Sequence, residues 1–200
     1  MEEKITFMSD GYQLEGLFRQ GASNKGVVIT HPHPLYGGDM HNPVVTAIVH
    51  AYQKNDYTTL RFNFRGTGNS QGTYADGRGE QEDVRAALAH LENFGIRHLI
   101  LAGYSFGAWV NAHLNCQDDG IQTMVMVSPP VAFLDFGSIA SLDCLNLIIT
   151  GSRDEIASSG LIHQLRPKWN PEACFEIIEG ADHFYGGYLD KLQAVLASNI

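Results

Sequence analysis

Ser105 lies at the centre of the run Gly103-Tyr104-Ser105-Phe106-Gly107, a spacing that suits a serine used as a covalent nucleophile. An apolar run precedes these five residues and a helix-like run follows them, so the serine is expected in a tight turn between strand and helix. Such a turn projects the hydroxyl outward and points the N–H of Phe106 at the oxyanion that develops during acyl transfer. Glycines at both flanks allow the strand and the helix to approach closely.

A serine hydroxyl is a poor nucleophile at neutral pH, and it needs a histidine base whose tautomer is fixed by a carboxylate. Three histidines follow the serine in the chain. His113 lies in the helix after the serine and His163 in a further predicted helix, whereas His183 lies in a loop just past a predicted strand. A loop at a strand end can reach the serine, so His183 is the predicted base.

The predicted orienting acid is Asp154, which directly follows a strand and falls between serine and histidine in the order Ser, Asp, His. Asp135, beyond the preceding strand, is the alternative acid. Either aspartate could instead be an ordinary turn residue that bonds its own backbone. A second oxyanion donor is expected in the loop after residue 30. Two prolines in that loop have no N–H, which leaves the backbone of His33, Leu35 or Tyr36.

Strands and helices alternate along the chain after an initial pattern typical of paired strands, and this order predicts an α/β fold. The expected strands are Val27–Thr30, Thr58–Phe64, one that ends at Tyr104, Thr123–Val127, Leu145–Thr150 and Phe175–Ile178. The expected helices are Val44–Lys54, Glu80–Asn93, one from Phe106, and Leu189–Ala197. We therefore expect one domain over residues 1–200, with a mostly parallel sheet of about seven or eight strands, helices on both faces and the candidate residues at the strand ends.

Composition argues against several classes of partner. The chain has 13 Lys and Arg against 22 Asp and Glu, a formal charge of −9, and no basic cluster, so neither nucleic acid nor an anionic membrane is an expected partner. The polar start Met-Glu-Glu-Lys and the lack of a long apolar stretch predict a cytoplasmic protein. Cys116, Cys144 and Cys174 are odd in number and form no C-x-x-C pair, so reduced thiols are expected.

Two readings from other classes compete with the serine mechanism. The cluster His31, His33, Asp39 and His41 could ligate a metal, but the prolines and glycines among these residues restrict their convergence. We therefore expect no metal and no cofactor. A binding protein without catalysis is the other alternative, and the presence of all three candidate triad residues argues against it.

The segments HPHPLYGG, FNFRGTGNSQG, GYSFG, GSRDE and GADHFY together resemble those of small bacterial α/β-hydrolases without a lid. These proteins are relatives of dienelactone hydrolases and of prolyl-oligopeptidase-type catalytic domains. The resemblance runs from about Gly11 to the C-terminus and implies a triad of Ser105, Asp154 and His183. It also implies an oxyanion donor two residues after the first histidine of HPHP, at His33. The chain departs from the dienelactone enzymes in having serine where they have cysteine.

Cap domains of this fold usually follow the strand after the helix of the nucleophile, and here only residues 128 to about 144 lie at that place. The segment is too short for a cap of several helices, so an open, shallow site for small or exposed acyl groups is expected. The candidate substrate-binding residues are Leu35, Tyr36, Tyr104, Phe133 and Tyr185, with Phe136 as a further apolar wall. The expected activity is cleavage of small carboxylic esters or thioesters. A peptidase or aminopeptidase-like hydrolase shares the acyl-enzyme route and stays open, as does the oligomeric state.

Overall fold

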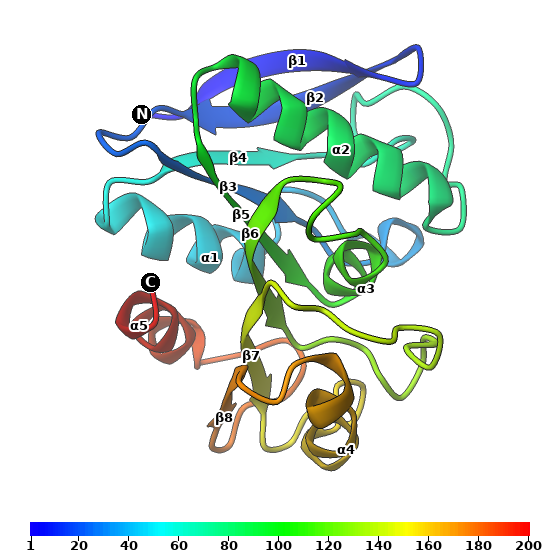
Figure 1. Cartoon of the computed structure of the whole chain (residues 1–200), viewed down its shortest axis with the longest axis vertical. Helices are drawn as coiled ribbons and strands as arrows, with labels where there is room; N and C mark the ends of the chain where they lie inside the picture. Colours follow the sequence, from blue (N-terminus) through cyan, green and yellow to red (C-terminus); the bar gives the residue numbers. More distant parts are fainter.

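An eight-stranded sheet runs through the computed structural model, which describes residues 1–200 (Figure 1). Its strand order is β1-β2-β4-β3-β5-β6-β7-β8. The strands are β1 Glu3–Ser9, β2 Tyr12–Arg19, β3 Lys25–Thr30, β4 Thr58–Phe62, β5 His98–Tyr104, β6 Ile121–Val127, β7 Leu145–Gly151 and β8 Cys174–Ile178. Pairings of β2 with β1 and with β4 are antiparallel, and all others are parallel. The predicted mostly parallel sheet is confirmed.

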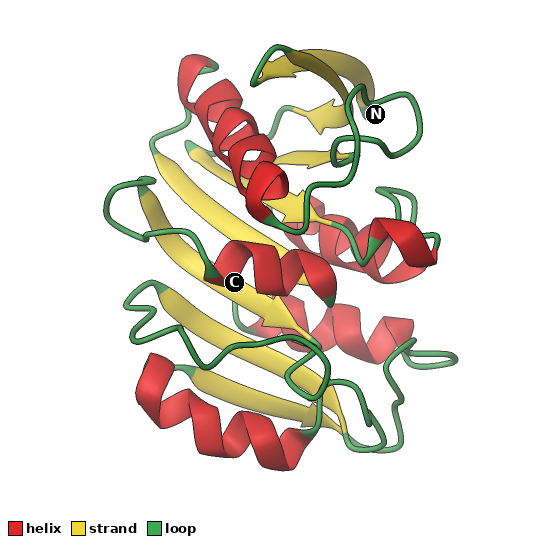
Figure 2. Cartoon of the chain, turned by 90° about the vertical axis from the view of Figure 1, so that its right-hand side faces the viewer, coloured by secondary structure: helices red, strands yellow, loops and turns green.

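Five α-helices cover the sheet, and Figure 2 shows them on both of its sides. They are α1 Pro43–Lys54, α2 Arg78–Asn93, α3 Phe106–Ala112, α4 Ser159–Trp169 and α5 Leu189–Ser198. A short 3-10 helix, Pro34–Tyr36, follows β3. Asn42 begins α1, because its side chain accepts a 2.9 Å hydrogen bond from the N–H of Val44 and a proline occupies the first helical position.

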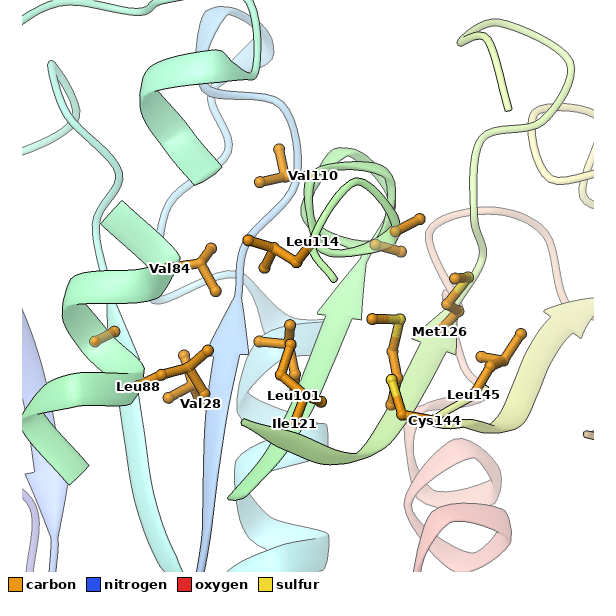
Figure 3. Close-up of a cluster of buried hydrophobic side chains, with 14 of the residues drawn as sticks. Val28, Val84, Leu88, Leu101, Val110, Leu114, Ile121, Met126, Cys144 and Leu145 are labelled. Carbon is orange, nitrogen blue, oxygen red and sulfur yellow. The ribbon is translucent and has the colours of Figure 1, made fainter. Parts of the chain in front are cut away.

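The central strands bury side chains on both faces, which explains their nearly continuous apolar sequences. Side chains alternate along a strand, so Val27 and Ile29 of β3 face α1 and α5, whereas Val28 faces α2 and α3. On β5, Ile100 and Leu101 divide between the two faces in the same way. Figure 3 shows part of the core on the face covered by α2 and α3, where side chains from β3, β5 and β6 meet those of the two helices.

The candidate residues lie where parallel strands end. Ser105 directly follows β5, Asp154 follows β7, and His183 follows β8. The carboxyl ends of parallel strands share one edge of a sheet, so residues far apart in sequence converge there. Residues 128–144, between β6 and β7, contain neither a helix nor a strand. The expectation that no cap domain covers this edge is confirmed.

The cysteines differ from expectation, because Cys116 and Cys144 form a disulfide with 5.7 Å between their Cα atoms. Both cysteines are hydrogen-bonded to β6 through their backbone: the N–H of Ile121 donates to the Cys116 carbonyl and that of Met124, in the middle of the strand, to the Cys144 carbonyl. Their sequence separation of 28 gives no local signal of this meeting. Only Cys174 is a free thiol. Disulfides are rare in the reducing cytosol, so the cytoplasmic location stays a prediction from composition alone.

None of the five helices is both long enough and apolar enough to cross a membrane.

Candidate active site

The turn between β5 and α3 holds Ser105 in a costly backbone conformation, with φ of +54° and ψ of −119°. Glycine is required on both sides of it. A Cβ at Gly103 would lie 2.6 Å from the backbone nitrogen of Ala108, and one at Gly107 would lie 2.7 Å from the carbonyl of Thr30. Both distances are far inside van der Waals contact with backbone that cannot move aside. The two glycines therefore allow strand and helix to meet tightly enough to present the serine.

Ser105, His183 and Asp154 form one hydrogen-bonded chain. The Ser105 Oγ lies 3.0 Å from Nε2 of His183, and Nδ1 of the same ring lies 2.9 Å from Oδ2 of Asp154. A carboxylate can only accept, so Nδ1 carries the proton and Nε2 accepts from the serine hydroxyl. All three residues are buried, at 5 to 8% exposure. The arrangement provides a hydroxyl, a base aimed at it and an anion that fixes the tautomer of the base.

The carboxylate of Asp154 is held by several donors. Its Oδ1 accepts hydrogen bonds from the N–H of Ile156 at 3.0 Å and of Ala157 at 2.7 Å. Burial by itself would raise the pKa of Asp154, but the His183 ring, the N–H of Ala157 and the hydroxyl of Ser128 outweigh it and hold the pKa below its usual range. The alternative acid, Asp135, is exposed and accepts from the N–H of Gly137, as a turn residue does. The structure thus brings Asp154, and not Asp135, to the histidine.

A second set of buried contacts supports the loop after β8, which carries His183. The hydroxyl of Tyr104 donates to the backbone carbonyl of His183 at 2.9 Å, and the two ring centroids lie 5.4 Å apart. The hydroxyls of Tyr185 and Ser128 lie 2.8 Å apart, and both residues are completely buried. Both residues also adopt positive φ, +56° for the tyrosine and +47° for the serine, a backbone conformation that residues other than glycine rarely adopt. These contacts constrain the backbone on both sides of the His183 ring.

The loop after β3 leaves one of its three candidate N–H groups free. The N–H of Leu35 donates to Nδ1 of His33, and that of Tyr36 donates to the carbonyl of His33. The N–H of His33 has no acceptor within the chain. The ring of His33 packs on that of Phe106, with centroids 4.6 Å apart, and Phe106 is the first residue of α3, where an N–H has no partner inside the helix. Two N–H groups without an acceptor, those of His33 and Phe106, therefore belong to residues whose side chains pack together beside Ser105.

His31 is a completely buried histidine whose two ring nitrogens are both used by the fold. Nδ1 donates to the carbonyl of Pro32 at 2.7 Å, and Nε2 accepts from the N–H of Phe64 at 3.0 Å. Burial lowers the pKa of His31 to about 4. The ring has no nitrogen left for a metal, and no group of three or more histidine, cysteine or acidic side chains is placed to hold one. The His31 ring therefore links the loop after β3 to Phe64, two residues past the end of β4.

This burial makes stability depend on pH. The pKa of His31 is about 4 in the fold against the ordinary 6.5, so in acid the unfolded chain binds a proton that the folded chain does not. Stability is lost as pH falls from 6.5 toward 4. Between pH 7.5 and 5, the wild-type free energy of unfolding should fall by about 2 kcal/mol more than that of His31→Gln. Urea unfolding at both pH values measures this, and equal falls in the two proteins would contradict it.

The pocket beside Ser105 has a volume of about 440 Å³. Of the five candidate substrate-binding residues, Tyr36, Tyr104 and Phe133 line it. Leu35 does not, because its side chain is 66% exposed to solvent outside the pocket. Tyr185 does not either, because its ring is buried in the core beneath the pocket and its hydroxyl is bonded to a serine.

Sequence reasoning missed several residues of the lining. They are Asn42, Pro130, Leu134, Ile156 and Phe184, together with glycines of the loop after β3. Phe184, 70% exposed, takes the place expected for its neighbour Tyr185. In a loop without strand or helix periodicity, no pattern tells which of two adjacent aromatic residues faces inward. Phe136, the further wall candidate, is buried against Trp169 in the core.

A family model described as the alpha/beta hydrolase family matches residues 27–198. The chain is a member of the α/β-hydrolase family. This α/β-hydrolase is 34% identical, over 194 residues, to an uncharacterized protein of Rickettsia prowazekii, with 91% of this chain and 82% of that protein covered.

Two solved structures of similar size match this α/β-hydrolase over nearly all of its length. One is an alpha-beta serine hydrolase homologue from Coxiella burnetii, with 33% identity, a TM-score of 0.91, and 99% of this chain and 97% of that chain covered. The other, from Xanthomonas campestris, is described as an a/b serine hydrolase without lid, with 26% identity, a TM-score of 0.91, and 99% and 93% covered.

Proposed function

We propose that this α/β-hydrolase is a serine hydrolase that cleaves small carboxylic esters or thioesters through an acyl-enzyme at Ser105. One observation carries the proposal: the unbroken chain of hydrogen bonds from the Ser105 hydroxyl through both nitrogens of His183 to Asp154. The strained turn at the serine supports it, because such strain persists where the surrounding structure maintains it for a task. The description of the Xanthomonas protein as a serine hydrolase, and of the Coxiella protein as a serine hydrolase homologue, supports it further.

In the first half of the reaction, Ser105 Oγ attacks the carbonyl carbon of the ester while Nε2 of His183 takes the hydroxyl proton. Asp154 stays a carboxylate and stabilises the imidazolium that forms. The carbonyl oxygen becomes an oxyanion between the N–H groups of Phe106 and His33. Nε2 then gives its proton to the leaving alkoxide or thiolate, and the acyl group stays bonded to the serine.

In the second half, water attacks the acyl carbon, and Nε2 of His183 takes a proton from it. The oxyanion forms again at the same two N–H groups. Nε2 returns the proton to Ser105 Oγ as the bond to the acyl group breaks, which releases the acid and restores the enzyme. The edge of the sheet has no cap, so water reaches the acyl-enzyme without a domain movement.

Hydrolysis of p-nitrophenyl butanoate by the purified protein tests the proposal. We expect turnover that saturates with substrate and is unchanged by EDTA, because no step uses a metal. A protein that shows no hydrolysis with short esters or thioesters contradicts the proposal. Loss of activity in EDTA that is restored by a divalent metal contradicts the mechanism.

The free N–H of His33 gives a test of the oxyanion hole. The backbone of His33 has φ of −56° and ψ of 120°, which proline adopts without strain, and its N–H makes no bond that the fold needs. His33→Pro therefore removes the donor, whereas the control His33→Ala removes only the ring. We expect kcat about 100- to 1000-fold lower in the proline variant than in the alanine variant. Equal kcat values would assign the second donor to another N–H.

A further inference from the structure

The pocket beside Ser105 has no charged side chain able to recognise an ionic group. None of its 15 lining residues is Asp, Glu, Lys or Arg. The two histidines in it are already engaged, since His183 holds the serine and the Nδ1 of His33 accepts from a backbone N–H. The one amide side chain in the lining is that of Asn42, whose Oδ1 caps α1. A charged substrate group placed here would lose its water and gain no side chain of opposite charge as a partner.

The mouth of the pocket is surrounded by exposed apolar side chains. Apart from Met1, the large apolar residues with the highest exposure are Tyr36 at 87%, Phe133 at 72%, Phe184 at 70% and Leu35 at 66%. Leu35 and Tyr36 belong to the short 3-10 helix after β3, and Phe133 and Phe184 lie in the loops after β6 and β8. All but Leu35 line the pocket. Such a concentration of exposed apolar surface marks a binding groove. Rings from three separate loops give the groove aromatic walls.

The volume of the pocket exceeds what a short acyl chain fills. A dry cavity of about 150 Å³ in another protein accommodates one benzene ring, and this pocket, at 440 Å³, is close to three times as large. Groups on both sides of the scissile bond can therefore lie against its walls. Pro130 is buried, Leu134 and Ile156 are half-buried, and all three add apolar surface to a lining that also contains the exposed aromatic side chains.

We infer, on the basis of the proposed function, that the substrate is an uncharged ester with a bulky apolar group, an aromatic ring best of all, and that Phe133 and Phe184 determine this specificity. Esters with a carboxylate or phosphate near the scissile bond are poor substrates, because the pocket gives them no cation. The net charge of −9 acts in the same direction by repelling anions. The expected substrates are therefore those small esters whose apolar part is larger than a short alkyl chain.

Two matched pairs of esters test the substrate class. The first pair is 4-(methoxycarbonyl)phenyl butanoate and 4-carboxyphenyl butanoate, which share size and acyl group and differ in charge. After correction for their rates of alkaline hydrolysis, we expect kcat/KM to be at least about tenfold higher for the neutral ester. The second pair is the p-nitrophenyl esters of 4-phenylbutanoate and acetate, and we expect the phenyl-bearing ester to have the higher kcat/KM.

Substitutions at the pocket mouth test the residues. Phe133→Ala and Phe184→Ala should each lower kcat/KM for the 4-phenylbutanoyl ester by up to about tenfold, with a much smaller effect on the acetyl ester. Phe94→Ala, at an exposed phenylalanine past the end of α2, is the matched control and should change neither value. Phe133→Arg supplies the missing cation, so it should raise kcat/KM for the carboxylate ester relative to its neutral partner.

The outcomes separate this inference from the proposed function. Hydrolysis that depends on Ser105 but shows no preference within either pair overturns the inference and leaves the serine mechanism in place. Equal losses for acetyl and phenylbutanoyl esters in the two alanine variants overturn the role of the phenylalanines. A protein that cleaves none of the four esters and no short thioester overturns both the inference and the proposed function.

Discussion

Replacing Ser105 by alanine is expected to lower ester turnover by about a million-fold, the loss typical of a missing triad nucleophile. The hydroxyl is the only group placed to form the acyl bond, since the base lies 3.0 Å from it. Without it, His183 can at best activate water, and only binding and the oxyanion donors continue to act. The rate of p-nitrophenol release from p-nitrophenyl butanoate, measured with wild type and variant side by side, gives the ratio.

Two controls make this result interpretable. Ser138→Ala removes the hydroxyl of an exposed serine outside the pocket and should leave turnover unchanged. Circular dichroism should show that Ser105→Ala is folded, because the turn between β5 and α3 depends on its flanking glycines rather than on the hydroxyl. A folded Ser105→Ala protein with turnover near that of wild type would rule out the acyl-enzyme mechanism.

Substitutions of the base and the acid should have the next largest effects. His183→Ala removes the only group that accepts the serine proton, so its loss should approach that of Ser105→Ala. Asp154→Asn should cost roughly ten-thousand-fold in kcat, because an amide leaves the imidazole in the wrong tautomer. Asp135→Asn is the matched control: its carboxylate is exposed and contacts only a turn, so kcat should be unchanged.

Steady-state kinetics of the two asparagine variants at several pH values check this assignment. The lowered pKa of Asp154 keeps its carboxylate ionised well below neutral pH, so the loss in Asp154→Asn should be present at each of these pH values. A larger loss in Asp135→Asn than in Asp154→Asn would show that the wrong carboxylate has been assigned to the histidine.

Much of the fold and of the site geometry follows from local patterns. The central strands have continuous apolar sequences because they are buried on both faces, and the helices between them carry a stripe of apolar residues. The pattern around Ser105 predicts its turn because only glycine fits at 103 and 107. The chain order of Asp154 and His183 then predicts which strand ends meet it. The geometry agrees with these expectations because topology, rather than side-chain detail, brings the three residues together.

Features that depend on tertiary contacts could not be predicted from local sequence patterns. The disulfide between Cys116 and Cys144 depends on two loops, 28 residues apart in sequence, that are both hydrogen-bonded to β6. Phe184 takes the place of Tyr185 in the pocket wall because the ring of Tyr185 is buried in the core and its hydroxyl bonds to Ser128. The engagement of both nitrogens of His31 depends on an N–H supplied by Phe64, more than thirty positions along the chain. Each requires the packed structure.

Labelling with a fluorophosphonate, followed by identification of the modified peptide, tests the central claim most directly. The phosphorus centre reacts with a serine only when a base activates the hydroxyl and an oxyanion site receives the developing charge. We expect a single adduct at Ser105, formed in step with the loss of esterase activity and absent from both Ser105→Ala and His183→Ala. An active protein that is not labelled, or that carries the adduct at another serine, would contradict the mechanism.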